Sequence, residues 1–267
     1  MRKLLALSSV ASVLLAGCGG GGEADTSTPP EGFVRIEGTL VDADGAAVAQ
    51  AQTRLPSRNG VWVATSDTSG HFRLEARASD FEGVSPVMVQ VVRDGYRPLP
   101  LYFSTLSTGT TYQVPTGGQQ ALHKLAAHQY IPKNSVGLWH IGDDGFDGSA
   151  NSQLQTKSVD VGLVFSVAAW TPELRSLYKS ATLEFVARGV QTVKCPGTQF
   201  GLAAGNFLSA PPIADSDPSG GFTRYRLAVD VQSVPLGADL VFFARSGRCP
   251  SDIDDLEFSD IVVSFGN

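Results

Sequence analysis

The spacing of turn residues from residue 33 onward is the feature that most constrains the fold. Short alternating or apolar runs are each bounded by Gly, Pro, Asn or Asp, and none of the first runs keeps a helical period. Runs of this length between turn residues are typical of strands in sandwiches and barrels. The first are Phe33 to Val41, Val61 to Thr65, His71 to Ala76 and Val87 to Val92. The chain is therefore predicted to be all-β.

Three turn motifs recur within residues 33–127. Gly38 precedes an Asp-x-x-Gly turn at Asp42 to Gly45, Asp67 to Phe72 reads Asp-x-x-Gly-x-Phe, and Gly95-Tyr96 follows a strand. This order resembles the carboxypeptidase regulatory-like domain, a small seven-stranded sandwich of transthyretin-like form. The resemblance implies that fold for residues 33–127. It implies no peptidase activity, because the peptidase domain that gives the family its name is absent from this sequence.

A second series of strands follows from about Leu138 and predicts a jelly-roll-like sandwich over residues 135–267. One helical turn is expected at Pro172 to Tyr178, with Thr171 as its cap. The segment is similar in outline to jelly-roll carbohydrate-binding modules, although no motif identifies a family. The expected strands are Val159 to Trp170, Ala181 to Val190, Phe200 to Ala204, Phe222 to Val231, Leu240 to Ala244 and Phe258 to Phe265.

The N-terminus has the three parts of a signal peptide: Arg2 and Lys3, an apolar run from Leu4 to Leu15, and small residues before Cys18. The run is shorter than the ~20 residues that span a bilayer. Leu14 to Cys18 resembles the bacterial lipobox, which implies cleavage after residue 17 and lipid on Cys18. Residues 18–32 have no apolar face and are predicted to be a flexible tether. By length, the remaining ~250 residues form one large or two small domains, and the strand series favours two tandem sandwiches.

The lipobox resemblance places the protein outside the cytosol, anchored to a membrane by its lipid. Gly19 follows the cysteine where an aspartate would imply retention at the inner membrane, which favours the outer membrane. Lipidation of Cys18 leaves Cys195 and Cys249 as the only other cysteines. In an oxidising compartment we expect these two to form a disulfide.

The sequence contains little that indicates catalysis. Its 26 acidic residues outnumber 20 basic ones, which argues against a nucleic-acid partner. The four histidines lack metal-ligand spacing, and neither a Gly-x-Ser-x-Gly elbow nor a phosphate-binding loop occurs. The chain is predicted not to be an enzyme. A pair of glycosidase carboxylates stays open, because such a pair meets only in space.

One acidic loop is a candidate for structural calcium. Carboxylates and an amide gather between residues 143 and 151, among glycines that let backbone carbonyls turn inward. A second acidic cluster precedes the last strand, which in a sandwich commonly pairs beside the first. The alternative is that these residues are solvated turn acids. The candidate ligands are Asp143, Asp144, Asp147, Asn151, Asp254 and Asp255.

Strand alternation also predicts a ligand surface on the second sandwich. In the run Val159 to Trp170 it places Phe165 on the core face and Trp170 on the opposite face, where an indole could stack on a sugar. Arg224 and Arg226 are predicted to point outward as hydrogen-bonding partners. The alternative for Trp170 is a core residue.

These patterns together predict a non-catalytic envelope protein that binds a glycan or another envelope polymer through its C-terminal sandwich. Two alternatives remain: a structural or assembly lipoprotein that packs against envelope proteins, and, less favoured, a glycan hydrolase.

Overall fold

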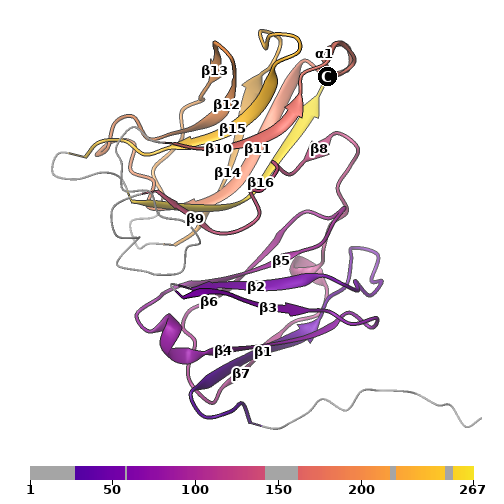
Figure 1. Ribbon diagram of the computed structural model, residues 1–267, viewed down its shortest axis with the longest axis vertical. Coiled ribbons are helices and arrows are strands. Elements are labelled where there is room, and N and C mark those ends of the chain that lie inside the picture. The colour runs from indigo at the N-terminus through magenta and orange to yellow at the C-terminus, as the bar shows by residue number, and fades with distance from the viewer. Residues whose placement is uncertain (1–27, 58, 142–161, 217–220, 250–254) are drawn as a thin grey trace, which may run out of the picture.

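The computed structural model describes residues 28–57, 59–141, 162–216, 221–249 and 255–267. These residues form two β-sandwiches, one above the other in Figure 1, each with its own hydrophobic core. The all-β prediction is confirmed. Within the described ranges no helix has the length and apolar character needed to cross a membrane. The predicted signal peptide, residues 1–17, and the lipidation site Cys18 lie outside them.

Two sheets form the first sandwich, in the strand orders β4-β1-β7 and β3-β2-β5-β6. β1 pairs antiparallel with β4 and parallel with β7. The structure has seven strands within residues 33–114, the number that the resemblance to the carboxypeptidase regulatory-like domain implies. They are β1 (Phe33–Thr39), β2 (Gln52–Ser57), β3 (Gly60–Thr65), β4 (His71–Arg77), β5 (Val87–Val92), β6 (Leu99–Phe103) and β7 (Thr111–Val114), with 3-10 turns at Ala78–Phe81 and Gly118–Gln120.

The Asp-x-x-Gly motifs form turns closed by the aspartate itself. Oδ1 of Asp67 accepts hydrogen bonds from the backbone N–H of Ser69 at 2.8 Å and of His71 at 2.9 Å. Gly70 has a φ of +79°, and a Cβ on it would lie 2.4 Å from the carbonyl oxygen of Leu40. Only glycine fits both requirements. The motif therefore fixes, through local geometry, the turn by which the chain passes from β3 in one sheet to β4 in the other.

The sheets of the second sandwich have the orders β10-β15-β12-β13 and β14-β11-β16-β8, with β9 also paired to β16. Helix α1 (Pro172–Leu177) begins where expected, and Oγ1 of Thr171 accepts from the N–H of Leu174 at 3.3 Å. The strands are β8 (Gln129–Tyr130), β9 (Trp139–Ile141), β10 (Gly162–Ala169), β11 (Ser180–Arg188), β12 (Gln199–Ala204), β13 (Phe207–Ser209), β14 (Thr223–Asp230), β15 (Asp239–Arg245) and β16 (Leu256–Gly266).

The predicted disulfide is present. Cys195 and Cys249 are bonded, and 54 residues of sequence separate them. The bond joins the segment after β11 to the segment after β15. Closing a loop of this length restricts the unfolded chain and stabilises the fold by about 4 kcal/mol in the chain-entropy estimate.

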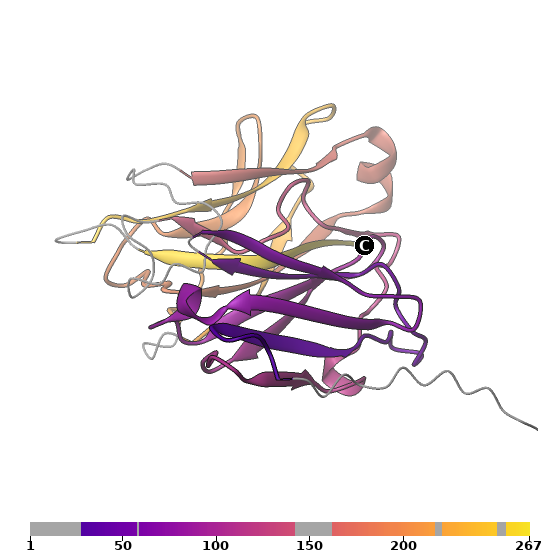
Figure 2. The ribbon, with the colours of Figure 1, turned by 60° about the horizontal axis from the view of Figure 1, so that its bottom comes forward.

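The sandwiches meet through one sheet of each. Figure 1 shows the sheet containing β2 and β5 as the layer of the first sandwich that faces the second. Met88 of β5 packs with Val186 of β11 and with Leu138 in a buried cluster against Phe222. The ring of Tyr102 stacks on Phe222 with centroids 5.4 Å apart. Figure 2 shows the same two bodies in contact with the first sandwich turned forward.

A buried ion pair of the second sandwich lies at this junction. Arg188 of β11 and Glu257 of β16 lie 2.6 Å apart, and both side chains are almost completely buried. Arg188 also donates to the carbonyl of Ser85 in the first sandwich at 3.3 Å, and its guanidinium lies 4.8 Å from the ring centre of Phe222. Polar and apolar contacts thus join the two cores.

Candidate functional site

A polar cleft of about 790 Å³ lies beside the junction of the two sandwiches. Its walls come from three parts of the chain: the outer face of β2 and β3, the end of β5 with the turn after it, and the loop of residues 131–136 between β8 and β9. The lining residues are Gln50, Gln52, Arg54, Thr65, Val92, Arg93, Asp94, Gly95, Tyr96, Pro98, Ile131, Pro132, Lys133, Asn134 and Val136.

The cleft exists because the second sandwich covers only part of the facing sheet. Met88, Gln90 and Tyr102, on the outer face of β5 and β6, contact the second sandwich. On the same face Gln52 of β2 and Thr65 of β3 stay exposed. Strand alternation explains which residues line the cleft, because the odd-numbered residues of β2 from 53 onward point into the core.

The loop of residues 131–136 is held at several points by hydrogen bonds. The N–H of Lys133 donates to the carbonyl of Ser166 in β10 at 2.6 Å, and the N–H of Ser135 donates to the carbonyl of Pro132 at 3.0 Å. Nε1 of Trp139 donates to the carbonyl of Ser135 at 2.8 Å. Asn134 takes a φ of +63°, a conformation that asparagine tolerates. The exposed side chains of Lys133 and Asn134 therefore stand on an anchored rim.

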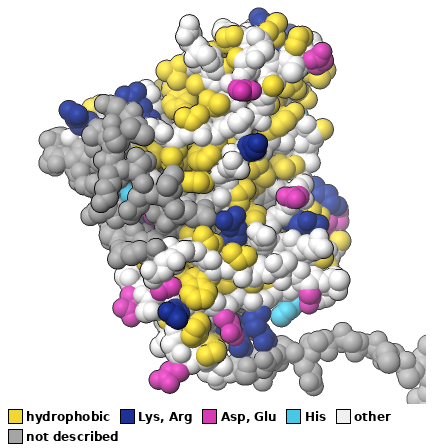
Figure 3. All heavy atoms as spheres, viewed as in Figure 1, with side chains coloured by type: hydrophobic (Ala, Val, Ile, Leu, Met, Phe, Trp, Pro, Cys, Tyr) yellow, Lys and Arg dark blue, Asp and Glu magenta, His cyan; other side chains and the backbone are white. Residues whose placement is uncertain are grey.

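Three cations and one carboxylate line the cleft. Arg54, Arg93 and Lys133 come from β2, the turn after β5 and the loop of residues 131–136, and Asp94 is the carboxylate. Among the described residues, no ion pair or side-chain hydrogen bond involves any of the three cations. Burial lowers the pKa of the half-buried Arg54 guanidinium. In Figure 3, Lys and Arg side chains occur at the level where the sandwiches meet.

A smaller cleft of about 260 Å³ shares Pro98 with the first. Its charges include a matched pair, because Nη2 of Arg97 donates to Oε2 of Glu184 at 2.8 Å. Arg224, which the sequence predicted as a ligand residue, lies in this smaller cleft beside His123. The ion pair already satisfies much of its charge, so the larger cleft is the stronger candidate.

The prediction for Trp170 is wrong. Its side chain is fully buried, with its ring 5.4 Å from that of Phe265. The pairing of β10 with β15 shifts between Ser166 and Ala168, which leaves Val167 as an extra residue. Such a bulge reverses the alternation beyond it. Ala169 therefore faces solvent, and Trp170 enters the core.

The alternation predicted for β14 is confirmed. Arg224 and Arg226 are exposed, while Tyr225 and Leu227 between and beside them are buried. Since Trp170 lies in the core, no surface combines these arginines with an exposed indole. A ligand role for Arg224 and Arg226 stays a prediction.

Five of the six residues predicted as calcium ligands lie outside the described residues. They are Asp143, Asp144, Asp147, Asn151 and Asp254. Asp255 is described, and its Oδ1 lies 3.6 Å from Nε2 of the buried His140. In the described parts of the chain, no group of three or more His, Cys, Asp or Glu residues is placed to hold a metal ion.

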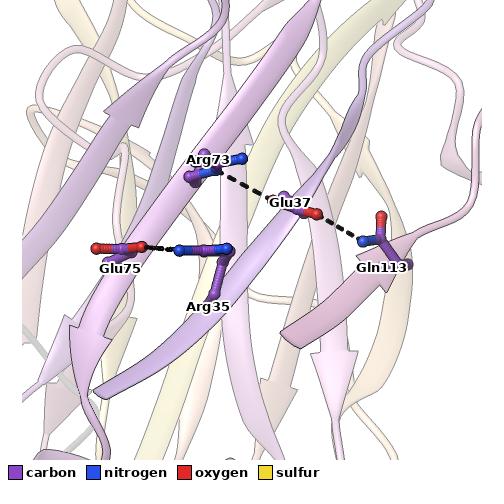
Figure 4. Close-up of polar contacts among 5 residues, drawn as sticks. All are labelled: Arg35, Glu37, Arg73, Glu75 and Gln113. Carbon is purple, nitrogen blue, oxygen red and sulfur yellow. Dashed lines mark hydrogen bonds and ion pairs between the residues drawn. The ribbon is translucent and has the colours of Figure 1, made fainter. Parts of the chain in front are cut away.

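The outer face of the β4-β1-β7 sheet carries two ion pairs and an amide that contacts one of them (Figure 4). Arg35 contacts Glu75 at 2.6 Å, Arg73 contacts Glu37 at 3.2 Å, and Nε2 of Gln113 donates to Glu37 at 2.7 Å. The strand register places each pair side by side. The charges of Arg35, Glu37, Arg73 and Glu75 are therefore satisfied within the sheet, so these four side chains are a weaker candidate for ligand binding.

Neither a family model nor a curated protein matches this chain. Among solved structures, a pilin, SpaD of Corynebacterium diphtheriae, matches at 9% identity and a TM-score of 0.24, over 89% of this chain and 61% of the pilin. A Bacteroides uniformis protein titled as a candidate carbohydrate-binding protein matches at 12% identity and a TM-score of 0.22, over 87% of this chain and 99% of its own.

The 3-chlorocatechol 1,2-dioxygenase of Rhodococcus opacus matches at 10% identity and a TM-score of 0.25, over 36% of this chain. The matched region spans less than two thirds of both the dioxygenase and the pilin, 62% and 61%. All three TM-scores are too low to support an argument about function. The function is therefore argued from the cleft itself.

Proposed function

We propose that this chain is a lipid-anchored, non-catalytic envelope protein that binds a segment of glycan in the cleft beside the junction of its sandwiches. The observation that carries the proposal is the composition of that cleft. The amides of Gln50, Gln52 and Asn134 and the phenol of Tyr96 converge there. Amides and a phenol suit sugar hydroxyls, because each can donate and accept hydrogen bonds. The volume falls within the ~300–1,000 Å³ common for ligand sites.

The same composition argues against cleavage of the bound glycan. Glycoside hydrolysis by the common mechanisms uses two carboxyl groups on either side of the scissile bond. Asp94 is the one carboxylate among the described residues that line this cleft. The described lining also contains no cysteine, serine or histidine, so it lacks a Ser–His or Cys–His pair of nucleophile and base.

The anchor follows from the sequence. The lipobox-like segment ending at Cys18 supports lipidation, and Gly19 favours the outer membrane. Residues 19–32 then separate the lipid from the first strand, which begins at Phe33. The tether would hold the cleft near the membrane and leave it free to meet a polymer of the envelope.

One observation favours the assembly alternative. Figure 3 shows hydrophobic side chains gathered over the second sandwich. Val164 and Leu208, on the two edge strands of the β10-β15-β12-β13 sheet, are 60% and 63% exposed. Exposed apolar residues of this kind suit a protein partner. Binding to an envelope protein through this sheet is therefore the second candidate function.

Retention on immobilised glycans tests the first proposal. The full chain, purified in detergent, is applied to an array that includes neutral and acidic polysaccharides, beside a Gln52→Ala, Asn134→Gly variant. Glycine tolerates the left-handed backbone of residue 134, so this variant should fold. We expect retention of the wild type and loss in the variant, with Arg175→Ala, at an exposed position of α1 outside both clefts, as a control. No retention of the wild type, or equal retention of the variant, would favour the assembly protein.

A further inference from the structure

Four buried or half-buried arginines elsewhere in this chain lie against carboxylates. Arg35 and Arg73 pair with Glu75 and Glu37 on the outer face of the β4-β1-β7 sheet (Figure 4). At the junction, Arg97 pairs with Glu184 and Arg188 with Glu257. The chain has an excess of acidic residues to supply such partners, with a net charge of −6. A half-buried arginine without a carboxylate partner therefore differs from these four.

Arg54 and Arg93 are two arginines that differ in this way, and both line the larger cleft. Each is half-buried, and among the described residues neither has a carboxylate partner. Lys133 adds a third cation from the anchored loop of residues 131–136. Asp94, which is exposed, supplies a single opposing charge. The described residues that line this cleft therefore carry a net charge of +2, although the protein as a whole is acidic.

The position of Arg54 favours the binding of an anion beside its guanidinium group. It lies in register beside Gln90 of β5, one strand away from the contact with the second sandwich. The sheet and the neighbouring domain remove part of its hydration, and burial lowers its pKa. A partly desolvated cation without a partner is costly, and an oxyanion brought by a ligand would offset that cost.

We infer that the ligand of this cleft is an anionic glycan whose carboxylate or phosphate groups contact Arg54, Arg93 and Lys133. This inference rests on the proposed glycan-binding function and names the class of its ligand. The amides and Tyr96 would contact the hydroxyl groups between the charged groups. Three cations from three separate segments favour a ligand with several charges over a single small anion.

The test compares three polysaccharides that differ in charge. Binding of the full chain to polygalacturonate, phosphomannan and neutral dextran is measured by titration. We expect polygalacturonate or phosphomannan, or both, to bind at least tenfold more tightly than dextran, and the ratio between these two identifies the preferred oxyanion. At about 1 M salt, where the screening length is ~3 Å, the preference should shrink strongly.

Charge variants assign the effect to the cleft. Arg93→Gln and Lys133→Gln should each weaken acidic-glycan binding on the order of tenfold, as the loss of a charged hydrogen bond does. Asp94→Asn should strengthen it, because the one opposing charge is removed. Arg175→Gln, at an exposed arginine of α1 outside both clefts, is the matched control, and unchanged melting temperatures show that each variant folds. Arg54→Gln, which keeps most of the packed side chain, completes the set.

The outcomes separate the two proposals. If dextran binds as tightly as the acidic polymers, or if Asp94→Asn has no effect while the cation variants also bind normally, the anionic ligand is overturned and glycan binding stands. If none of the three polymers binds, and none is retained on the array, both proposals fail. Binding to anionic lipid vesicles without binding to any glycan would also overturn the inference.

Discussion

Gln90 of the first sandwich donates a hydrogen bond from Nε2 to Oδ1 of Asp260 in the second, at 2.5 Å. Both side chains are buried. The pairing of β16 with β11 shifts where Asp260 lies, and Asp260 takes a φ of +54°. A bulge of this kind changes the direction in which a side chain points. Here the carboxyl group of Asp260 reaches across the junction to Gln90. A single irregular residue thus contributes to the relative placement of the two domains.

Asp260 should make the stability of the protein depend on pH. Burial raises its pKa to about 6, although Gln90, Arg224 and Ser259 act in the opposite direction. Its unfolded pKa is about 3.9, so the folded state holds the proton more tightly. The free energy of unfolding should therefore fall as the pH rises from about 4 to about 6, by up to about 3 kcal/mol, and then level off.

Asp260→Asn should remove this slope and raise stability at neutral pH. Asparagine keeps the oxygen that accepts from Gln90 and tolerates a positive φ. Urea unfolding between pH 4 and 7 measures the effect, with the exposed Asp239→Asn as control. An unchanged slope in Asp260→Asn would show that the pH dependence has another origin.

Removing one charge of the buried pair of Arg188 and Glu257 should lower the stability of the protein. Glu257→Gln or Arg188→Met leaves a buried charge without its partner and should lower the free energy of unfolding by about 3–5 kcal/mol. The double variant should lose less than the sum of the two. Arg97→Gln, at the more exposed pair with Glu184, should cost less than either single change. Additive losses in a double-mutant cycle at Arg188 and Glu257 would contradict this account.

Trp170 should behave as a core residue. Trp170→Ala removes a fully buried indole and should lower the free energy of unfolding by about 3–5 kcal/mol. Trp170→Phe should lose less, because much of the ring remains. Thermal and urea unfolding measure both. If Trp170→Ala leaves stability unchanged and abolishes glycan binding, the indole is a ligand residue and the burial described above does not hold in solution.

Cys18 should determine membrane attachment. Cys18→Ser removes the thiol that the lipid would modify, so the protein should leave the membrane fraction or accumulate with its signal peptide uncleaved. Fractionation with mass spectrometry of the N-terminal peptide distinguishes the two. Cys195→Ser serves as the control, because it also removes one cysteine but leaves Cys18 in place. Membrane fractionation of Cys18→Ser identical to that of the wild type would rule out the lipid anchor.

The sequence by itself determined those features that act over a few residues. The Asp67 and Gly70 turn could be identified because its hydrogen bonds and its φ requirement are local. The outward arginines of β14 followed from simple alternation, since that strand has regular pairing over its whole length. The disulfide followed from counting cysteines in a chain that the sequence predicts to be exported.

Tertiary structure alone decided the side to which Trp170 points and the place where a ligand would bind. The bulge at Val167 arises from pairing with a strand about 70 residues away, so the local pattern of β10 could not reveal it. Arg54, Arg93 and Lys133 sit in segments that read as an ordinary strand, turn and loop. They share a cleft only because one sheet packs against another with two of its strands left uncovered, and that offset depends on contacts between residues as distant in sequence as Gln90 and Asp260.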